Sequence, residues 1–248
     1  YINSLNELVQ QGHNSTVDEE CVRHVQTHVS QDSSKRPQGG SHTPDLPSNI
    51  IGNYIFIPTQ KAQDVSIEKF SKIGMFQLME ETAAVCALKG IPLVIKIHPH
   101  LGGGEFNEQA AVIRRLQNLH PSLNVRESRA SINFLTTNAR FTVTLNGGTL
   151  VDNFFTGTPV LTLAKSMFQG SDAVVHSDDS VKSGLERMLN TTWTEQRQTR
   201  QRQIVCWYKR VSLNVDKTDE ENIMALGYHF KKRWPESSCG FEHSSKSA

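Results

Sequence analysis

The chain has 248 residues and a formal net charge of +1, and 21% of its residues are charged. A balance this close to neutral excludes a global electrostatic attraction to nucleic acid or to an anionic membrane surface. No apolar run approaches the ~20 residues that a membrane-spanning helix needs, and the N-terminus lacks the charged-then-apolar pattern of a secretory signal. We therefore expect a cytoplasmic protein without a transmembrane segment, long enough for one large domain or two small ones.

The cysteines do not form a recognisable metal or redox motif. There are four of them: Cys21, Cys86, Cys206 and Cys239. No two have the spacing of a Cys-x-x-Cys pair, so we expect unpaired thiols in a reducing compartment. Cys86 lies in an apolar helical pattern and is predicted to be a reduced core residue.

Two tripeptides fit the N-glycosylation sequon, Asn14-Ser15-Thr16 and Asn190-Thr191-Thr192. The sequon requires only an Asn followed two positions later by Ser or Thr, so it arises often by chance. Without a signal segment, we give these two tripeptides little weight.

The two ends of the chain differ in composition from its middle. Residues 1–49 are expected to form an N-terminal helical segment followed by a polar linker rich in Ser, Pro and Gly. The compact pattern starts near Ile50, and we assign residues 50–235 to one domain with C-terminal helices. Residues 236–248 are rich in Ser and Lys and are expected to be a disordered tail.

From Ile50 on, short apolar strands alternate with longer helical stretches. Strands are expected at 54–57, 93–97, 123–125, 141–145, 159–163 and 173–175. Helices are expected at 67–88, 106–119, 131–138, after 145 up to 155, and at 181–189, 195–211 and 219–232. Several strands are apolar at nearly every position, as when helices cover both faces of a parallel sheet. The sequence thus predicts an α/β fold with a doubly wound, Rossmann-like parallel sheet.

Two further stretches have a plain interpretation. The run Gly102-Gly103-Gly104 has no strand leading directly into it, so we expect a mobile loop that could act as a lid. The polar and basic stretch from Glu195 to Arg202 is expected to be the solvated face of a helix.

The most informative stretch runs from Phe141 to Leu150, where an apolar strand ends at the turn Asn146-Gly147-Gly148-Thr149. Apolar residues at helical spacing follow at once, which predicts strand, tight turn and helix. The first amides of a helix lack helical partners and carry the positive end of its dipole, so such a turn suits a phosphate. The turn lacks both the Walker ending and the dinucleotide fingerprint. The alternative is a tight turn without a ligand.

A second candidate element follows the predicted strand 54–57. Gln60 and Asp64 flank the connection to the next helix, four positions apart. Asp64 is a plausible N-cap residue, with its carboxylate accepting backbone N–H bonds. Alternatively, its carboxylate faces the crevice at the carboxyl ends of the strands, where ligands bind in parallel sheets, and acts on an acceptor hydroxyl or a sugar cation.

The third element is Lys96-Ile97-His98-Pro99-His100, just past another apolar strand. Imidazole can donate a hydrogen bond to a phosphate oxygen or transfer a proton near neutral pH. Lys96 projects to the same side of the strand as His98. A structural histidine is the alternative, and a metal pair with His100 lacks further ligands at zinc-site spacing.

Together these elements resemble the capsule-polysaccharide glycosyltransferases, the group that contains the Kdo transferases of bacterial capsule assembly. The resemblance covers about residues 53–176. It rests on four elements in order: Phe56-Ile57-Pro58-Thr59-Gln60 with Asp64, Lys96-Ile97-His98-Pro99, Thr144-Leu145-Asn146-Gly147-Gly148-Thr149, and Gly157-Thr158-Pro159-Val160.

The resemblance implies the GT-B architecture, with this chain as the half that binds the nucleotide sugar. It also implies that His98 contacts the donor phosphate, that Asp64 is the catalytic carboxylate and that the 146–149 turn holds the phosphates. Gln60 and Lys96 complete the expected donor site, and neither a metal nor a cofactor is expected.

We therefore expect a glycosyltransferase that moves a sugar from a nucleotide-sugar donor to a glycan acceptor. Residues 1–49 are too short and too polar for a complete acceptor-binding half, so we expect that this half is either reduced or supplied by further domains of a longer chain. The same fold also supports a nucleotide-sugar epimerase or hydrolase, or a binding module without catalysis. Asp64 acts either as a base, which inverts the anomeric centre, or as a nucleophile, which retains it.

Overall fold

The structure is a computed structural model that describes residues 16–31 and 45–211, with side chains described up to Trp207. The described residues up to Cys206 belong to one compact unit. The predicted helix at 219–232, the predicted tail and Cys239 lie outside the described residues, as does most of the predicted linker.

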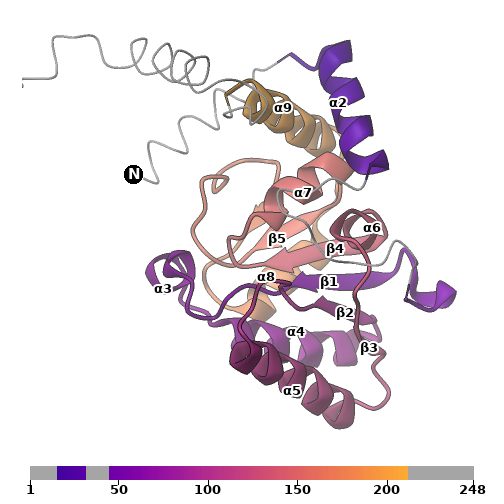
Figure 1. The fold of residues 1–248 in the computed structure, drawn as a ribbon, viewed down its shortest axis with the longest axis vertical. Coiled ribbons are helices and arrows are strands. Elements are labelled where there is room, and N and C mark those ends of the chain that lie inside the picture. Colours follow the sequence, from indigo (N-terminus) through magenta and orange to yellow (C-terminus); the bar gives the residue numbers. More distant parts are fainter. Residues whose placement is uncertain (1–15, 32–44, 212–248) are drawn as a thin grey trace, which may run out of the picture. The chain divides into compact units, whose positions relative to one another are not determined.

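The described part of the chain contains one six-stranded sheet, in the order β3-β2-β1-β4-β5-β6 (Figure 1). Every pairing between neighbouring strands is parallel, which confirms the predicted Rossmann-like sheet. The strands are β1 (Tyr54–Pro58), β2 (Leu93–Lys96), β3 (Val125–Glu127), β4 (Ala139–Thr144), β5 (Val160–Thr162) and β6 (Val175–His176). The strand order reverses between β1 and β4, and a crevice opens at such a switch point.

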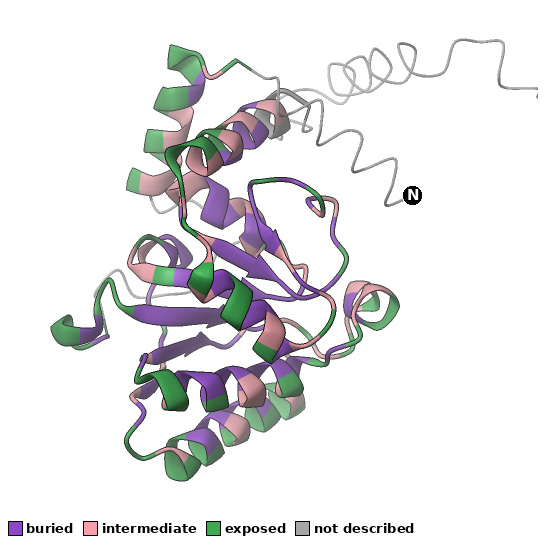
Figure 2. Ribbon diagram, turned by 180° about the vertical axis from the view of Figure 1, so that it is seen from behind, coloured by how far each residue is buried: buried purple, intermediate pink, exposed green. Residues whose placement is uncertain are grey.

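Helices cover both faces of this sheet (Figure 1). One face carries α4 (Met75–Lys89), α5 (Gly103–Leu119) and α8 (Val181–Asn190), and the other carries α6 (Ile132–Thr137) and α7 (Thr149–Thr156). Successive side chains of a strand point to opposite faces. In β1, Ile55 and Ile57 accordingly belong to the first core and Tyr54 and Phe56 to the second. Figure 2 shows that the strands are buried almost throughout, which explains why their sequences are apolar without alternation.

Several helices end at a glycine or begin at a capping side chain. Gly90 and Gly157 adopt left-handed conformations, with φ of 64° and 72°, and end α4 and α7. Glycine takes this conformation without the steric cost that a Cβ brings. At the start of α6, the side chain of Ser131 accepts a hydrogen bond from the Phe134 amide. The predicted helix at 131–138 is thereby confirmed.

The helix predicted at 67–88 is in fact two helices, α3 (Val65–Phe70) and α4. Between them the Ser71 hydroxyl donates to the Ile73 carbonyl at 2.7 Å and accepts from the Ile73 amide at 3.1 Å. A side chain that bonds the nearby backbone in this way competes with helical hydrogen bonds. The apolar spacing continues through the break, so periodicity alone did not reveal it.

The glycine run after β2 is not a mobile loop, contrary to the prediction. Gly103 and Gly104 are the first residues of α5, and Gly102 is its N-cap. This start brings Glu105 and Gln109 against the loop that follows β1. The Ala62 amide donates to Glu105, and the Gln109 side-chain amide donates to the Gln60 carbonyl at 2.9 Å. The run therefore opens a helix that supports the neighbouring loop.

A disulfide joins Cys21 in α2 (Glu19–Ser30) to Cys206 in α9 (Glu195–Val211), with a Cα–Cα distance of 5.6 Å. The expectation of four unpaired thiols is therefore wrong for this pair. The two cysteines are 185 positions apart, so their proximity depends on the folded topology. Cys86 is a free thiol in the core, as predicted, and burial raises its pKa to about 12.

The N-terminal helix α2 also packs against α7, where the ring of His28 stacks on that of Phe155 with their centroids 3.7 Å apart. Among the helices in the described ranges, none combines the length and the apolar character that crossing a membrane requires.

Candidate functional site

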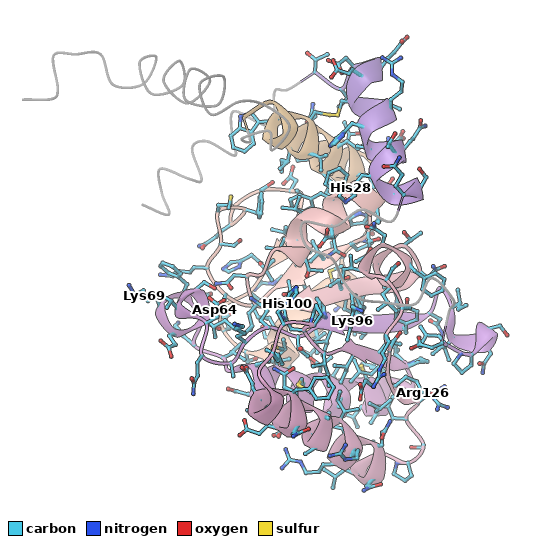
Figure 3. All side chains as sticks on the ribbon, viewed as in Figure 1. His28, Asp64, Lys69, Lys96, His100 and Arg126 are labelled. Carbon is cyan, nitrogen blue, oxygen red and sulfur yellow. A yellow bond between two sulfur atoms is a disulfide. The ribbon has the colours of Figure 1, made fainter. Side chains whose placement is uncertain are left out.

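The loops that follow β1, β2 and β4 line one cavity of about 440 Å³ at the carboxyl edge of the sheet. All of the predicted site residues line it: Gln60, Asp64, Lys96, His98, Asn146, Gly147, Gly148 and Thr149. Figure 3 labels three of the lining residues: Asp64 after β1, Lys96 at the end of β2 and His100 after β2. The expected convergence is therefore observed, while the chemical role of each residue stays a prediction.

The β4–α7 turn presents the start of a helix to the cavity. Gly148 is the N-cap of α7, and no side chain caps this helix. The amides of Leu150 and Val151 bond back to the carbonyls of Gly147 and Gly148, which makes the turn tight. Because these bonds use the Leu150 and Val151 amides, only the amides of Gly148 and Thr149 are left for water or a ligand at this helix start, where the helix dipole favours an anion.

The two glycines of this turn are not equivalent. A Cβ on Gly147 would lie 2.8 Å from both Cδ and Nε2 of Gln60, which is closer than such atoms approach. A Cβ on Gly148 would meet nothing within 4 Å, and its backbone is right-handed helical. Of the two glycines, only Gly147 lies against another group, and that group is the end of the Gln60 side chain, which would have to shift to admit a Cβ.

Gln60 links the loop after β1 to the turn after β4. Its Oε1 accepts from the Thr144 hydroxyl at 3.2 Å and from the Asn146 amide at 3.4 Å. The backbone amide of Gln60 donates to the sulfur of Met75 in α4. The side chain thus fixes the relative position of two cavity walls, a structural role that the sequence did not indicate.

Asp64 is the N-cap of α3, as the plainer of its two interpretations predicted. Its Oδ1 accepts from the Ser66 amide at 2.8 Å and from the Ser66 hydroxyl at 2.6 Å. These bonds, aided by the charges of Lys61 and His98, lower the pKa of the carboxyl group against a smaller effect of burial. Because its pKa is lowered, the Asp64 carboxyl group is ionised near neutral pH and is a weak proton acceptor. This carboxylate also lines the cavity.

Ser66 is a cavity residue that sequence reasoning missed. Besides its bonds to Asp64, its hydroxyl lies 3.2 Å from Oδ1 of Asn146, and its carbonyl accepts from Nδ2 of Asn146 at 2.9 Å. Ser66 therefore joins the capped carboxylate to the β4–α7 turn. The spacing Asp-x-Ser at a helix start was the available signal, because a serine there can reach the capping carboxylate.

Lys96 lines the cavity, but its ammonium group binds the protein. Its Nζ donates to the Ala130 carbonyl at 2.8 Å and lies 3.5 Å from that of Arg129, and the residue is only 5% exposed. These carbonyls belong to the loop between β3 and α6. To contact a donor phosphate as predicted, the Lys96 ammonium group would have to give up its bonds to these backbone carbonyls.

His98 is held by its backbone and by its ring. Its amide donates to the Thr59 hydroxyl at 2.9 Å, and its Nδ1 accepts from the His100 amide at 3.2 Å. In the neutral imidazole, a ring nitrogen that accepts leaves the proton on the other nitrogen. The His98 ring therefore carries its donor on Nε2, the form needed to bond a phosphate oxygen.

The cavity is not uniformly cationic. Asp152, in the first turn of α7, also lines it and is 7% exposed. A carboxylate at this position stabilises the helix start but opposes an anion beside it, and it is an acceptor suited to sugar hydroxyls. In residues 16–31 and 45–211, no group of three or more His, Cys, Asp or Glu side chains is arranged to hold a metal ion.

No known family model matches the sequence, and no curated protein matches it. Its fold is similar to that of Thermosulfurimonas dismutans KpsC, a beta Kdo 2,7 transferase. The two chains are 15% identical, with a TM-score of 0.50, and the match covers 91% of this chain and 67% of that one.

Two further solved structures match at lower scores. A glycosyltransferase from Rickettsia africae is 12% identical, with a TM-score of 0.47, and the match covers 92% of this chain and 54% of that one. The UDP-GlcNAc 2-epimerase of Methanocaldococcus jannaschii is also 12% identical, with a TM-score of 0.42 and coverage of 78% and 47%. The chain thus spans about two thirds of the KpsC structure and about half of the other two.

At 15% identity, the likeness to KpsC concerns the fold alone. It agrees with the predicted Rossmann-like sheet. Activity, substrates and membership of the capsule family are a separate matter and depend on the site.

Proposed function

We propose that this chain is a glycosyltransferase subunit or domain that takes a sugar from a nucleotide-sugar donor and passes it to a glycan acceptor. The observation that supports this most is the shared cavity, where three loops at the switch point of a parallel sheet meet the uncapped start of α7. The motif resemblance to the capsule-polysaccharide glycosyltransferases points the same way. Further domains of a longer chain would bind the acceptor.

In this proposal, the donor phosphate binds at the 146–149 turn, where the amides of Gly148 and Thr149 and the hydroxyl of Thr149 bond the anion. His98 donates from Nε2 to a phosphate oxygen and stabilises the negative charge of the leaving group. The carboxylate of Asp152 would repel a phosphate, so in this proposal it accepts hydrogen bonds from hydroxyl groups of the donor instead. Lys96 contributes mainly by holding the wall beside His98.

The reaction forms a bond between the acceptor oxygen and the anomeric carbon and breaks the bond between that carbon and the phosphate oxygen. We take Asp64 as the nucleophile, because its lowered pKa makes it a poor general base and its carboxylate lines the cavity. Asp64 then forms a glycosyl ester as the phosphate leaves. The acceptor oxygen displaces Asp64 in a second step, and its proton passes to the departed phosphate. This course retains the anomeric configuration.

Binding is tested first, by thermal shift against UDP-, GDP-, CMP- and dTDP-sugars. A ligand at ~100 times its Kd raises the free energy of unfolding by about 2.7 kcal/mol. We expect stabilisation by one nucleotide class and a weaker effect in the variant His98→Ala. If none of these nucleotide sugars shifts the melting temperature, the proposed donor site is wrong.

Catalysis is tested with a pair of Asp64 variants. Asn is as good an N-cap as Asp, so Asp64→Asn keeps the start of α3 and removes only the charge, whereas Asp64→Ala removes both. Lys69→Ala is the matched control, because this exposed residue lies on α3 and does not line the cavity (Figure 3). With the substitutions made in the protein that includes the acceptor-binding domains, we expect Asp64→Asn to bind donor and to lose transfer, while Lys69→Ala behaves as the wild type. Full transfer by Asp64→Asn would refute the catalytic role.

The product assay also separates the proposal from other activities of this fold. Transfer requires both donor and acceptor, so nucleotide-sugar turnover without a glycan would identify an epimerase or hydrolase instead. The anomeric configuration of the product distinguishes a nucleophile at position 64 from a base.

A further inference from the structure

The tripeptide Asn190-Thr191-Thr192, which fits the glycosylation sequon, lies at the end of α8 and has no part in the proposed transfer reaction. Asn190 is the last residue of α8 and is exposed. At Thr191 the backbone turns to an extended conformation, with φ of −85° and ψ of 124°, and Thr192 is exposed as well. The tripeptide therefore lies on an accessible connection between α8 and α9, which is where the glycosylation sequon is used.

A glycan on Asn190 would not block the cavity at the carboxyl edge of the sheet. Helix α8 begins five residues after β6 ends, so its start lies near the carboxyl edge of the sheet, where the cavity is. Its ten residues span about 15 Å, and the helix packs back along β5 and β6. Asn190 is at its far end, and a bulky group there would project away from the proposed donor site.

An independent observation concerns the compartment in which the chain folds. The disulfide between Cys21 and Cys206 joins two helices, and both cysteines are buried, at 3% and 1% exposure. Disulfides persist in oxidising environments and are rare in the cytosol. The compartment that supplies such an environment in eukaryotic cells is also the one in which Asn side chains receive glycans.

We propose that Asn190 carries an N-linked glycan and that the chain folds in an oxidising secretory compartment. The donor is an oligosaccharide linked to a lipid through pyrophosphate. A bond forms between Nδ2 of Asn190 and C1 of the first sugar, the C1–O bond to the pyrophosphate breaks, and the amide proton passes to the lipid pyrophosphate released. This proposal replaces the cytoplasmic location that the sequence led us to expect.

The first experiment uses the protein isolated from its own cells. Its N-glycans are removed enzymatically in ¹⁸O-labelled water, which marks each formerly glycosylated Asn by conversion to a labelled acid. Trypsin then releases the peptide 188–197, which contains Asn190 and no other Asn. We expect this peptide to carry the label at position 190. Recovery of the peptide only in its unlabelled form would overturn the proposal.

The second experiment tests the site itself by translating the full chain, behind a signal sequence, into microsomes. The sequon at Asn14 is removed by Asn14→Gln in every sample, so one glycan-sized step of glycosidase-sensitive mass remains for position 190. We expect Asn190→Gln and Thr192→Ala to lose this step and Thr192→Ser to keep it. A translocated, disulfide-bonded chain that lacks the step overturns the proposal, and neither result depends on whether the cavity binds a nucleotide sugar.

Discussion

Replacing Gly147 by Ala tests the packing of the cavity wall, because the effect follows from one contact. The new Cβ would lie 2.8 Å from Cδ and Nε2 of Gln60 and must push that side chain aside. The displaced Gln60 loses its bonds to Thr144 and Asn146. At about 1 kcal/mol for each hydrogen bond, the variant should be less stable by about 2 kcal/mol, a fall in melting temperature of roughly 4–8 °C for a chain of this size.

The matched control is Gly148→Ala, one residue later. Its Cβ meets nothing within 4 Å, and its φ of −58° suits any L residue. Replacing Gly by Ala at such a position stabilises a protein by about 0.4–1 kcal/mol, because the unfolded chain loses freedom. The two neighbouring substitutions should therefore change the free energy of unfolding in opposite directions, as measured by urea denaturation.

A double-mutant cycle isolates the cause. In a Gln60→Ala background the obstructing side chain is gone, so Gly147→Ala should cost less than in the wild type, with a coupling of about 1–2 kcal/mol. Equal costs in both backgrounds, or equal effects of the Ala substitutions at 147 and 148, would refute the reasoning.

Three further predictions concern other parts of the chain. The lowered pKa of Asp64 means that its charged capping contribution is present above pH ~3.9, the pKa in unfolded chains, and is lost as pH falls through its folded value. The stability difference between wild type and Asp64→Ala should therefore shrink in acid unfolding curves, and a difference independent of pH would contradict this. Removing the disulfide with Cys21→Ala and Cys206→Ala should cost about 2–4 kcal/mol, and a reductant should lower the melting temperature of the wild type but not of this variant. Gly184→Ala would place its Cβ 2.7 Å from Cδ2 of Leu163, so overpacking should cost about 1–3 kcal/mol and leave nucleotide binding unchanged in a thermal-shift titration.

Much of the fold could be predicted because each strand of this sheet is buried on both faces. Residues such as Ile55, Val94 and Val143 are fully buried, so the strands appear in the sequence as unbroken apolar runs between helical periods. The edges were harder to place. The strand predicted at 123–125 lies at Val125–Glu127, because Leu93 of β2 pairs with Val125 and pairing fixes the register.

The candidate site could be predicted in position but not in detail. Parallel strands bring their carboxyl ends to one edge, so the residues after β1, β2 and β4 had to meet. The hydrogen-bond partners of each side chain lie on elements that are distant in sequence. Lys96 finds its partner 34 residues away at Ala130, and Gln60 finds Asn146 86 residues away. Nothing in the local sequence encodes these contacts.

The hydroxyl of Ser66 has two acceptors and one hydrogen. It lies 2.6 Å from Oδ1 of Asp64 and 3.2 Å from Oδ1 of Asn146, and a hydroxyl donates only once. While Asp64 is charged, the shorter bond holds this hydrogen. If Asp64 lost its charge, this hydroxyl could rotate to donate to Oδ1 of Asn146, so a change at the carboxylate would reach the β4–α7 turn through the rotation of one hydroxyl group.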